Sequence, residues 1–124
     1  MDRFVINGGI PLSGEMIPQG NKNAALPLMS ATLLSDEPVI LHNMPDIRDV
    51  HTMRQLLQSL GVSIRQIENS NSWEFHAKNI RPADLDPELC RKIRASILFA
   101  GPMTARYGAL ELPPPGGDVI GRRR

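Results

Sequence analysis

Cysteine and aromatic residues are scarce in this sequence, and each scarcity excludes a class of protein. The single cysteine, Cys90, excludes a disulfide-stabilised scaffold and any zinc site built from cysteines. Aromatic residues make up only 4% of the chain, which disfavours a stacking platform for single-stranded nucleic acid. No apolar run reaches the roughly 18 residues that a membrane-spanning helix needs. The net charge of +1 excludes a protein that coats polyanions through bulk charge.

What remains is an ordinary composition for one folded domain. The chain has 124 residues, of which 41% are hydrophobic and 22% are charged, and this length supports one hydrophobic core. The first residues carry no signal-peptide pattern, so we expect a protein of a reducing cytoplasm. The 10 glycines and 11 prolines cluster between segments of regular pattern, which marks these clusters as turns.

Hydrophobic periodicity predicts alternating helices and strands. The clearest helix follows Pro45, with Asp46 as its N-cap and Gly61 at its C-terminal end. Its apolar positions recur at helical spacing, at Ile47, Val50, Met53, Leu57 and Leu60. We also expect helices at 23–34 and 88–107, the second of them kinked or split at 101–102. Strands are expected at 3–7, 12–17, 38–42, 62–67, 73–77 and 109–112.

An internal repeat with an offset of 71 residues relates two parts of the chain. The offset places the helix from Asn23 on the helix from Arg94, and the strand at 39–41 on the segment at 110–112. The repeating unit then reads helix, strand, helix, strand, strand, and its second copy stops where its second helix should begin. The matches are short enough to arise by chance. If the repeat is real, the chain is a fragment.

Cationic side chains lie at equivalent junctions of this repeat, each at the start of a helix. Lys22 and Asn23 follow Gly20 at a loop-to-helix junction, and Arg94 begins the second helix. Helix N-termini present free N–H groups and a partial positive charge, which favour phosphate or carboxylate. These residues are therefore candidates for an anion site. The alternative is that they are ordinary solvated side chains at helix starts.

A glycine-rich loop at 116–121 carries one carboxylate, Asp118, and is followed by arginines at 122–124. An acid in a mobile loop beside arginines can donate a proton to an anionic substrate. The alternative is a glycine turn in which Asp118 bonds to its own backbone. The loop lacks the spacing of a phosphate-binding P-loop. The three histidines are not spaced as metal ligands, and we expect no metal site.

Three segments together resemble a known family: Gly20 to Pro27, Arg94 to Ile97, and Gly116 to Arg123. In this order and at these separations, they resemble the N-terminal part of the enolpyruvyl transferases that act on UDP-N-acetylglucosamine, the MurA family. The similarity runs over all 124 residues. The related shikimate-pathway enolpyruvyl transferases share the architecture but match these motifs less well.

The resemblance implies a fold and a domain organisation. The fold is an α/β inside-out barrel built from repeated βαβαββ units, and it is incomplete in this chain. Residues 1–21 would form strands that belong to the second domain of the full enzyme. Residues 22–124 would form the first unit, and the start of the second unit, of the first domain. The full enzymes are several times longer than this chain.

The resemblance also implies a reaction, the first committed step of peptidoglycan synthesis. The 3′-hydroxyl of UDP-N-acetylglucosamine adds to C2 of phosphoenolpyruvate, a general acid protonates C3, and phosphate then leaves. By position, Lys22 and Asn23 would contact phosphoenolpyruvate, Arg94 would hold the nucleotide sugar, Arg123 would reach the phosphates and Asp118 would be the proton donor. No cofactor, metal, nucleic acid or membrane is implied. We expect the isolated chain to be inactive, because half of the active cleft belongs to the absent domain.

Two residues depart from the commonest family pattern. Many members carry cysteine in place of Asp118, and fosfomycin alkylates that thiolate, so resistance to fosfomycin is expected here. An ordinary aspartate has a pKa of about 3.9, and about one in a thousand is protonated at pH 7. Bound phosphoenolpyruvate and the exclusion of water would have to raise this pKa for Asp118 to act as an acid. Arg124 replaces a proline, which leaves the contacts at the end of the loop open.

Two other functions are compatible with the sequence. The first is a stand-alone nucleotide-sugar-binding module that carries out no chemistry, and a natural stop codon after Arg124 would favour it. The second is nucleic-acid binding by the arginine run, and an affinity that falls steeply with salt concentration would indicate it.

Overall fold

Helices and strands alternate along the chain in the computed structural model, which describes residues 3–81 and 85–117. In order, the elements are α1 (Lys22–Ala31), the 3₁₀ helix η1 (Thr32–Leu34), β1 (Val39–Leu41), α2 (Arg48–Ser59), β2 (Ser63–Ile67), β3 (Ser72–His76), α3 (Pro87–Lys92), the 3₁₀ helix η2 (Arg94–Phe99) and α4 (Ala100–Tyr107). The predicted helix after Pro45 is confirmed as α2, and the strands expected at 62–67 and 73–77 are confirmed as β2 and β3. The helix that begins near Asn23 is confirmed as α1 followed by η1.

The three strands form an antiparallel sheet in the order β1-β3-β2. Phe75 of the central strand lies opposite Val39 on one side and Ile64 on the other, and its side chain is fully buried. On the outer face, Arg65 Nη2 donates to Glu74 Oε2 at 3.0 Å across a directly opposed pair. The alternation of apolar and charged residues therefore sets which face of the sheet carries the core.

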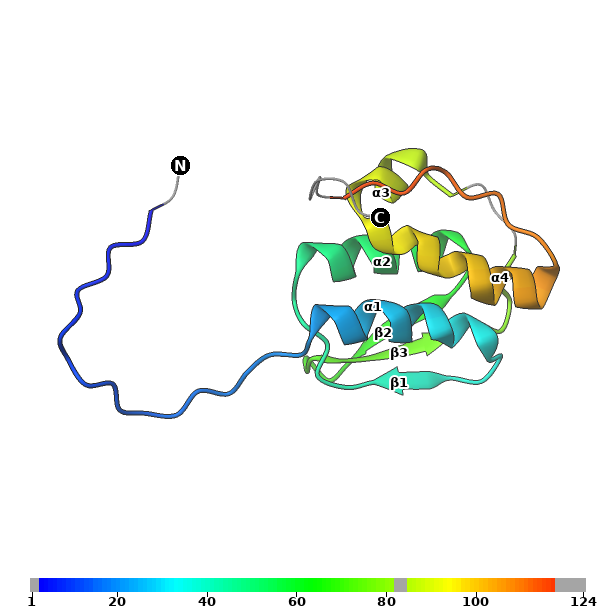
Figure 1. The fold of residues 1–124 in the computed structure, drawn as a ribbon. Helices are drawn as coiled ribbons and strands as arrows, with labels where there is room; N and C mark the ends of the chain where they lie inside the picture. Colours follow the sequence, from blue (N-terminus) through cyan, green and yellow to red (C-terminus); the bar gives the residue numbers. More distant parts are fainter. Residues whose placement is uncertain (1–2, 82–84, 118–124) are drawn as a thin grey trace.

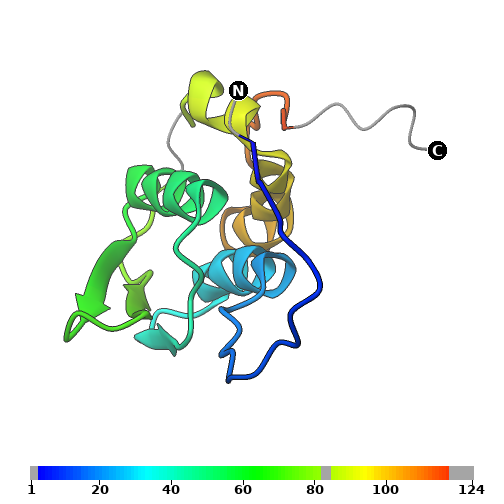
Figure 2. The same cartoon turned by 90° about the vertical axis from the view of Figure 1, so that its left-hand side faces the viewer.

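The helices cover one face of the sheet in layers, as Figures 1 and 2 show. α1 and α2 lie next to the sheet, and α3, η2 and α4 pack on the side of these helices that faces away from it. The fully buried Met53, Leu56 and Leu57 of α2 belong to the same core cluster as Phe99 and Met103 of η2 and α4. One hydrophobic core thus joins all the layers. No helix among the described residues is long and apolar enough to cross a membrane.

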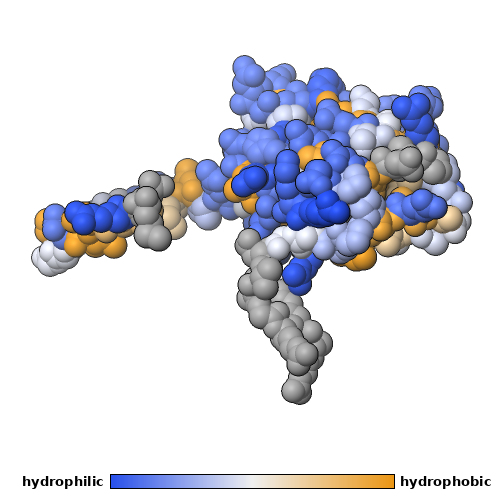
Figure 3. Space-filling view, turned by 90° about the horizontal axis from the view of Figure 1, so that it is seen from above, coloured by the Kyte–Doolittle hydropathy of each residue, from blue (hydrophilic) through white to orange (hydrophobic). Residues whose placement is uncertain are grey.

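The N-terminal segment, residues 3–19, leaves the body of the molecule as an extended arm (Figure 1). It contains neither of the strands expected at 3–7 and 12–17, and this prediction is wrong for the chain as it stands. A strand needs hydrogen bonds from a neighbouring strand, and the arm runs away from the sheet. Phe4 and Leu12 are 95% and 99% exposed, and Figure 3 shows hydrophobic residues along the arm.

The helix expected at 88–107 is interrupted, but not where the sequence predicted. The helix is interrupted at Ile93, which has extended backbone angles and separates α3 from η2. Gly101 and Pro102 instead lie in the first turn of α4, where proline removes no helical hydrogen bond.

Two further local predictions are wrong. Ile47, rather than Asp46, is the N-cap of α2, because the Asp46 carboxylate accepts a hydrogen bond from His51 instead. The segment 109–112 forms no strand. It runs over the helices on the side away from the sheet, and Leu110 and Leu112 pack against the core (Figure 1).

Arg106 ties α4 to the layers beneath it. Its Nη1 donates to the carbonyl oxygens of Leu33, at 3.0 Å, and Ala77, at 2.8 Å. Substituting Arg106→Met leaves both partly buried carbonyls without this donor, so we expect the free energy of unfolding to fall by about 1–3 kcal/mol. The exposed Arg65→Met control loses only a surface ion pair and should cost less than about 1 kcal/mol. Urea unfolding of the two variants measures the difference, and equal losses would contradict the role given to Arg106.

Candidate functional site

Lys22 and Asn23 occupy the first turn of α1, as the sequence predicted. Asn21 caps this helix, because its Oδ1 accepts a hydrogen bond from the Asn23 backbone N–H at 2.7 Å. The turn before the cap is tightly packed, since a Cβ on Gly20 would lie 1.8 Å from the carbonyl oxygen of Asn43. The start of α1 is therefore held in place by a backbone crossing that only glycine allows.

The Lys22 ammonium is paired across two helix starts. Its Nζ lies 3.0 Å from Oδ2 of Asp49, which stands in the first turn of α2. The side chains of Lys22 and Asp49 are 50% and 33% exposed, so the pair is reached by solvent. Asn23 is exposed beside it, and within the described ranges its side-chain amide has no hydrogen-bonding partner. A lysine ammonium has three donors, so Lys22 retains capacity for an anionic ligand.

Arg94 begins η2, at the position that the repeat offset pairs with Asn23, and it is exposed. The glycine-rich loop starts directly against it. The backbone N–H groups of Gly116 and Gly117 donate to the carbonyl oxygens of Cys90, at 3.1 Å, and Arg91, at 3.0 Å. A Cβ on Gly117 would lie 3.0 Å from the backbone nitrogen of Arg94. The loop is therefore fixed at its base to the C-terminal end of α3, beside Arg94.

The starts of α1, α2 and η2 face the same side of the molecule, onto which Figure 2 looks. The helices α1 and η2 also contact each other, because Ser30 Oγ donates to the carbonyl oxygen of Leu98 at 2.8 Å. Lys22 and Asn23 begin α1 and Arg94 begins η2, whereas the contact between Ser30 and Leu98 joins the later parts of the two helices. Helix N-termini on that face add partial positive charge, which favours an anion. Asp118 and Arg123 lie outside the described residues.

A second polar cluster lies at the other side of α2. His51 Nε2 pairs with Asp46 Oδ1 at 2.7 Å, and the Arg54 guanidinium stacks on Trp73 with 3.7 Å between its Cζ and the ring centroid. Burial lowers the pKa of Arg54, against the opposing effect of the Asp46 carboxylate. These residues line a hollow of about 270 Å³, and its lining includes none of Lys22, Asn23 and Arg94. His51 is a surface side chain, since it is half-exposed.

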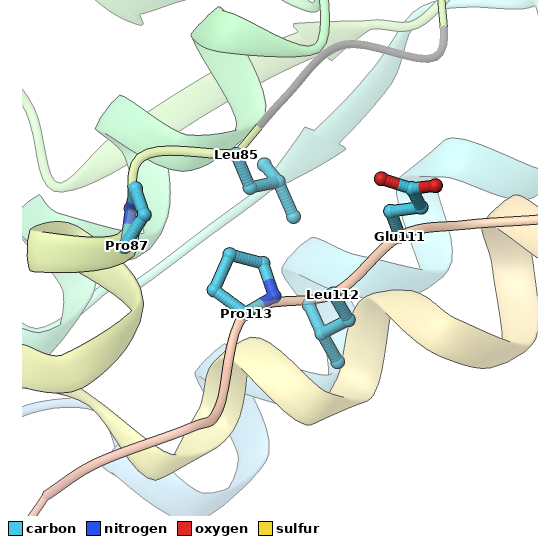
Figure 4. A pocket seen from close by; sticks show the side chains of 5 residues that line it. All are labelled: Leu85, Pro87, Glu111, Leu112 and Pro113. Atoms are coloured by element: carbon cyan, nitrogen blue, oxygen red, sulfur yellow. The ribbon is translucent and has the colours of Figure 1, made fainter.

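Two more hollows are lined by residues other than Lys22, Asn23 and Arg94. One, of about 260 Å³, runs between the start of α1 and the segment 40–44. The other, of about 350 Å³, lies between Leu85 and the segment 111–113 (Figure 4). There Leu85 and Pro113 face each other, Leu112 points away from them toward the core, and Glu111 stands at the edge. In the described part of the chain, no group of three or more His, Cys, Asp or Glu residues could hold a metal ion.

Cys90 is fully buried in the core, as expected of a small apolar residue. Desolvation raises the pKa of its thiol, and this outweighs the hydrogen bond with Ser96, which lowers the pKa. The nearby Asp86 carboxylate raises the pKa further. The native thiol is therefore a poor nucleophile.

Sequence reasoning missed Asp49 as a partner of Lys22. The two positions are 27 residues apart in the sequence. No local pattern signals such a contact, because it depends on how α1 and α2 pack. The repeat gives no help either, since residue 120, at the corresponding position, is an isoleucine.

The sequence matches a known family over almost its whole length. The family model of EPSP synthase (3-phosphoshikimate 1-carboxyvinyltransferase) matches residues 6–123. The UDP-N-acetylglucosamine 1-carboxyvinyltransferase of Bradyrhizobium diazoefficiens is 55% identical over 122 residues, which are 98% of this chain. The protein of the same name from Treponema denticola is 49% identical over 124 residues, which are 100% of this chain.

These relatives are much longer than the present sequence. The chain spans 28% of the Bradyrhizobium protein and 29% of the Treponema protein. Among solved structures, the enolpyruvyl transferase NikO from Streptomyces tendae aligns with a TM-score of 0.71 at 23% identity. That alignment covers 82% of this chain and 23% of the other, and it shows a shared fold. From the match of the family model and the relatives, the chain belongs to the enolpyruvyl transferase family.

Proposed function

We propose that this chain is the N-terminal part of a UDP-N-acetylglucosamine 1-carboxyvinyltransferase. The enzyme would transfer the enolpyruvyl group of phosphoenolpyruvate to the 3′-hydroxyl of UDP-N-acetylglucosamine, with release of phosphate, in the cytoplasm. The observation that carries the proposal is the 55% identity, over 98% of the chain, to a relative that bears this name. By itself the chain is inactive, because the remainder of such an enzyme completes the active cleft.

The reaction divides into an addition and an elimination. In the addition, the 3′-hydroxyl oxygen bonds to C2 of phosphoenolpyruvate, the hydroxyl loses its proton, and C3 gains one. In the elimination, C3 loses a proton, the bond from C2 to the phosphate oxygen breaks, and the enolpyruvyl ether remains. Both steps therefore need a group that exchanges protons at C3 and cations that hold the phosphate.

The residues of this chain divide these tasks. Lys22 and Asn23 bind phosphoenolpyruvate at the start of α1, and Arg94 holds the nucleotide sugar at the start of η2. Asp118 donates the proton to C3, and Arg123 binds phosphate. Support comes from the positions of Lys22 and Arg94 at helix starts and from the loop base fixed beside Arg94.

The extended arm bears on the architecture of the longer enzyme. We propose that residues 1–21 pair with strands of a second domain, and that residues 22–124 begin an inside-out barrel of βαβαββ units. The arm supports this, because seven of its large hydrophobic side chains are 72–99% exposed to solvent: Phe4, Val5, Ile6, Ile10, Leu12, Met16 and Ile17. Such side chains are normally covered by a partner surface.

The test is activity of the chain extended along its reading frame to the length of its relatives. Phosphate release from phosphoenolpyruvate should then depend on UDP-N-acetylglucosamine. Substituting Lys22→Gln should lower kcat/KM by at least about a hundredfold, because the variant lacks a positively charged hydrogen-bond donor to phosphoenolpyruvate. Lys78→Gln removes an exposed lysine after β3 and serves as the matched control, for which we expect no change. Absence of UDP-N-acetylglucosamine-dependent phosphate release in the extended chain would refute the proposed function.

A further inference from the structure

The pair between Lys22 and Asp49 is unusual for an anion-binding lysine, because it sets a carboxylate beside the proposed phosphate site. The distance between Lys22 Nζ and Asp49 Oδ2 is 3.0 Å. Negative charge so close to a bound anion opposes binding. Asp49 must therefore have a favourable effect that exceeds its electrostatic repulsion of the bound anion.

Stability offers only a weak reason. Both side chains are partly exposed, at 50% and 33%, and ion pairs of this kind contribute little to folding. Asp49 already favours the start of α2 as an acidic residue in its first turn, whether or not Lys22 is near. Asp46, three residues before Asp49 and just ahead of the same helix, pairs with His51 rather than with Lys22.

Geometry offers a stronger reason. A lysine side chain has a flexible stem of four carbons that ends in an ammonium group. When this ammonium has no partner, it samples many positions. A bond from one N–H of Lys22 to Asp49 fixes the ammonium against the start of α2, and the remaining two N–H groups then point in defined directions. Both helix starts are themselves held by the core, through Ala25 and Leu26 of α1 and Val50 of α2.

We infer that Asp49 is a positioning residue, which holds the Lys22 ammonium in the orientation that receives the anionic group of phosphoenolpyruvate. This inference rests on the proposed function of Lys22. Asp49 touches no reacting atom and acts through Lys22 alone. Its loss therefore affects phosphoenolpyruvate and spares the nucleotide sugar.

The first experiment uses the extended enzyme and steady-state kinetics in both substrates. Asp49→Ala should raise KM for phosphoenolpyruvate about tenfold and lower kcat/KM for it by about ten- to a hundredfold, as expected for a misplaced catalytic contact. KM for UDP-N-acetylglucosamine should change less than twofold. Asp49→Glu should recover part of the loss. The control Asp46→Ala, at the same helix start, should leave both KM values as they are.

The second experiment needs no activity and uses the present chain. Lysine labelled with ¹³C at Cε reports side-chain order by NMR relaxation, and Lys22 should be more ordered than the exposed Lys78. Asp49→Ala should abolish that difference, whereas Asp46→Ala should preserve it. This readout keeps the pairing testable even if the extended enzyme proves inactive, in which case the proposed function fails separately.

Three outcomes would overturn the inference. Tighter binding of phosphoenolpyruvate by Asp49→Ala would mean that repulsion dominates. Equal changes in both KM values, together with a lower melting temperature, would assign Asp49 a merely structural role. Unchanged Lys22 order in Asp49→Ala would show that the carboxylate does not hold the ammonium.

Discussion

Fosfomycin is expected to leave the extended enzyme active, with covalent inactivation at least about a hundredfold slower than in its Asp118→Cys variant. The resemblance to the MurA family places a cysteine thiolate, the target of this epoxide, at the position that Asp118 occupies. A carboxylate is a much poorer nucleophile toward an epoxide than a thiolate is. Time-dependent loss of activity, followed by mass spectrometry of the peptide that contains residue 118, measures both rate and site.

The cysteine that this chain does contain should not substitute for the missing thiolate. Cys90 is fully buried, and desolvation raises the pKa of its thiol, so little thiolate exists at neutral pH and the epoxide cannot reach it. The control is Cys90→Ala, which should not alter sensitivity in either background. Covalent labelling of Asp118 itself, or inactivation of the unsubstituted enzyme as fast as of Asp118→Cys, would contradict the prediction.

Elements with a strong local pattern were predicted well from the sequence. The helix α2 follows from apolar residues at helical spacing and from Gly61, whose φ of +93° matches the expected helix end. The hairpin of β2 and β3 follows from the alternation around Phe75. In both cases, residues close in sequence decide the structure, and the core that they build needs little further information.

Elements that depend on a distant partner were predicted badly. The apolar pattern at 3–7 and 12–17 is typical of strands, yet no strand of the described residues lies beside the arm. The segment 109–112 has a similar pattern, but its leucines pack on the helices rather than in a sheet. Pattern alone shows that these side chains need burial, and it cannot show against what.

The candidate site divides in the same way. Lys22 and Arg94 were found because each begins a helix, which is a local feature and was marked by the repeat. Asp49 was missed because its contact with Lys22 arises from the packing of α1 on α2. The anchoring of the loop at 116–117 on α3 was missed for the same reason.

That anchoring makes Gly116 the most sensitive position of the loop base. A Cβ there would lie 1.7 Å from the carbonyl oxygen of Arg91 and 2.6 Å from its Cα. These are backbone atoms, so no side-chain rotation relieves the clash, and the loop itself must move. The bonds from the N–H groups of Gly116 and Gly117 to α3 would break, at a local cost of about 2 kcal/mol.

We therefore expect Gly116→Ala to separate the loop from Arg94 while the sheet and α1 stay folded. In the extended enzyme, the displaced loop would carry Asp118 and Arg123 with it, and kcat/KM should fall by at least about a hundredfold. In the present chain, hydrogen exchange at the Gly117 amide should become much faster. Gly101→Ala is the matched control, because nothing lies within 4 Å of its Cβ and alanine favours the helix α4. Protected exchange at Gly117 and full activity in Gly116→Ala would show that the loop base does not position the acid.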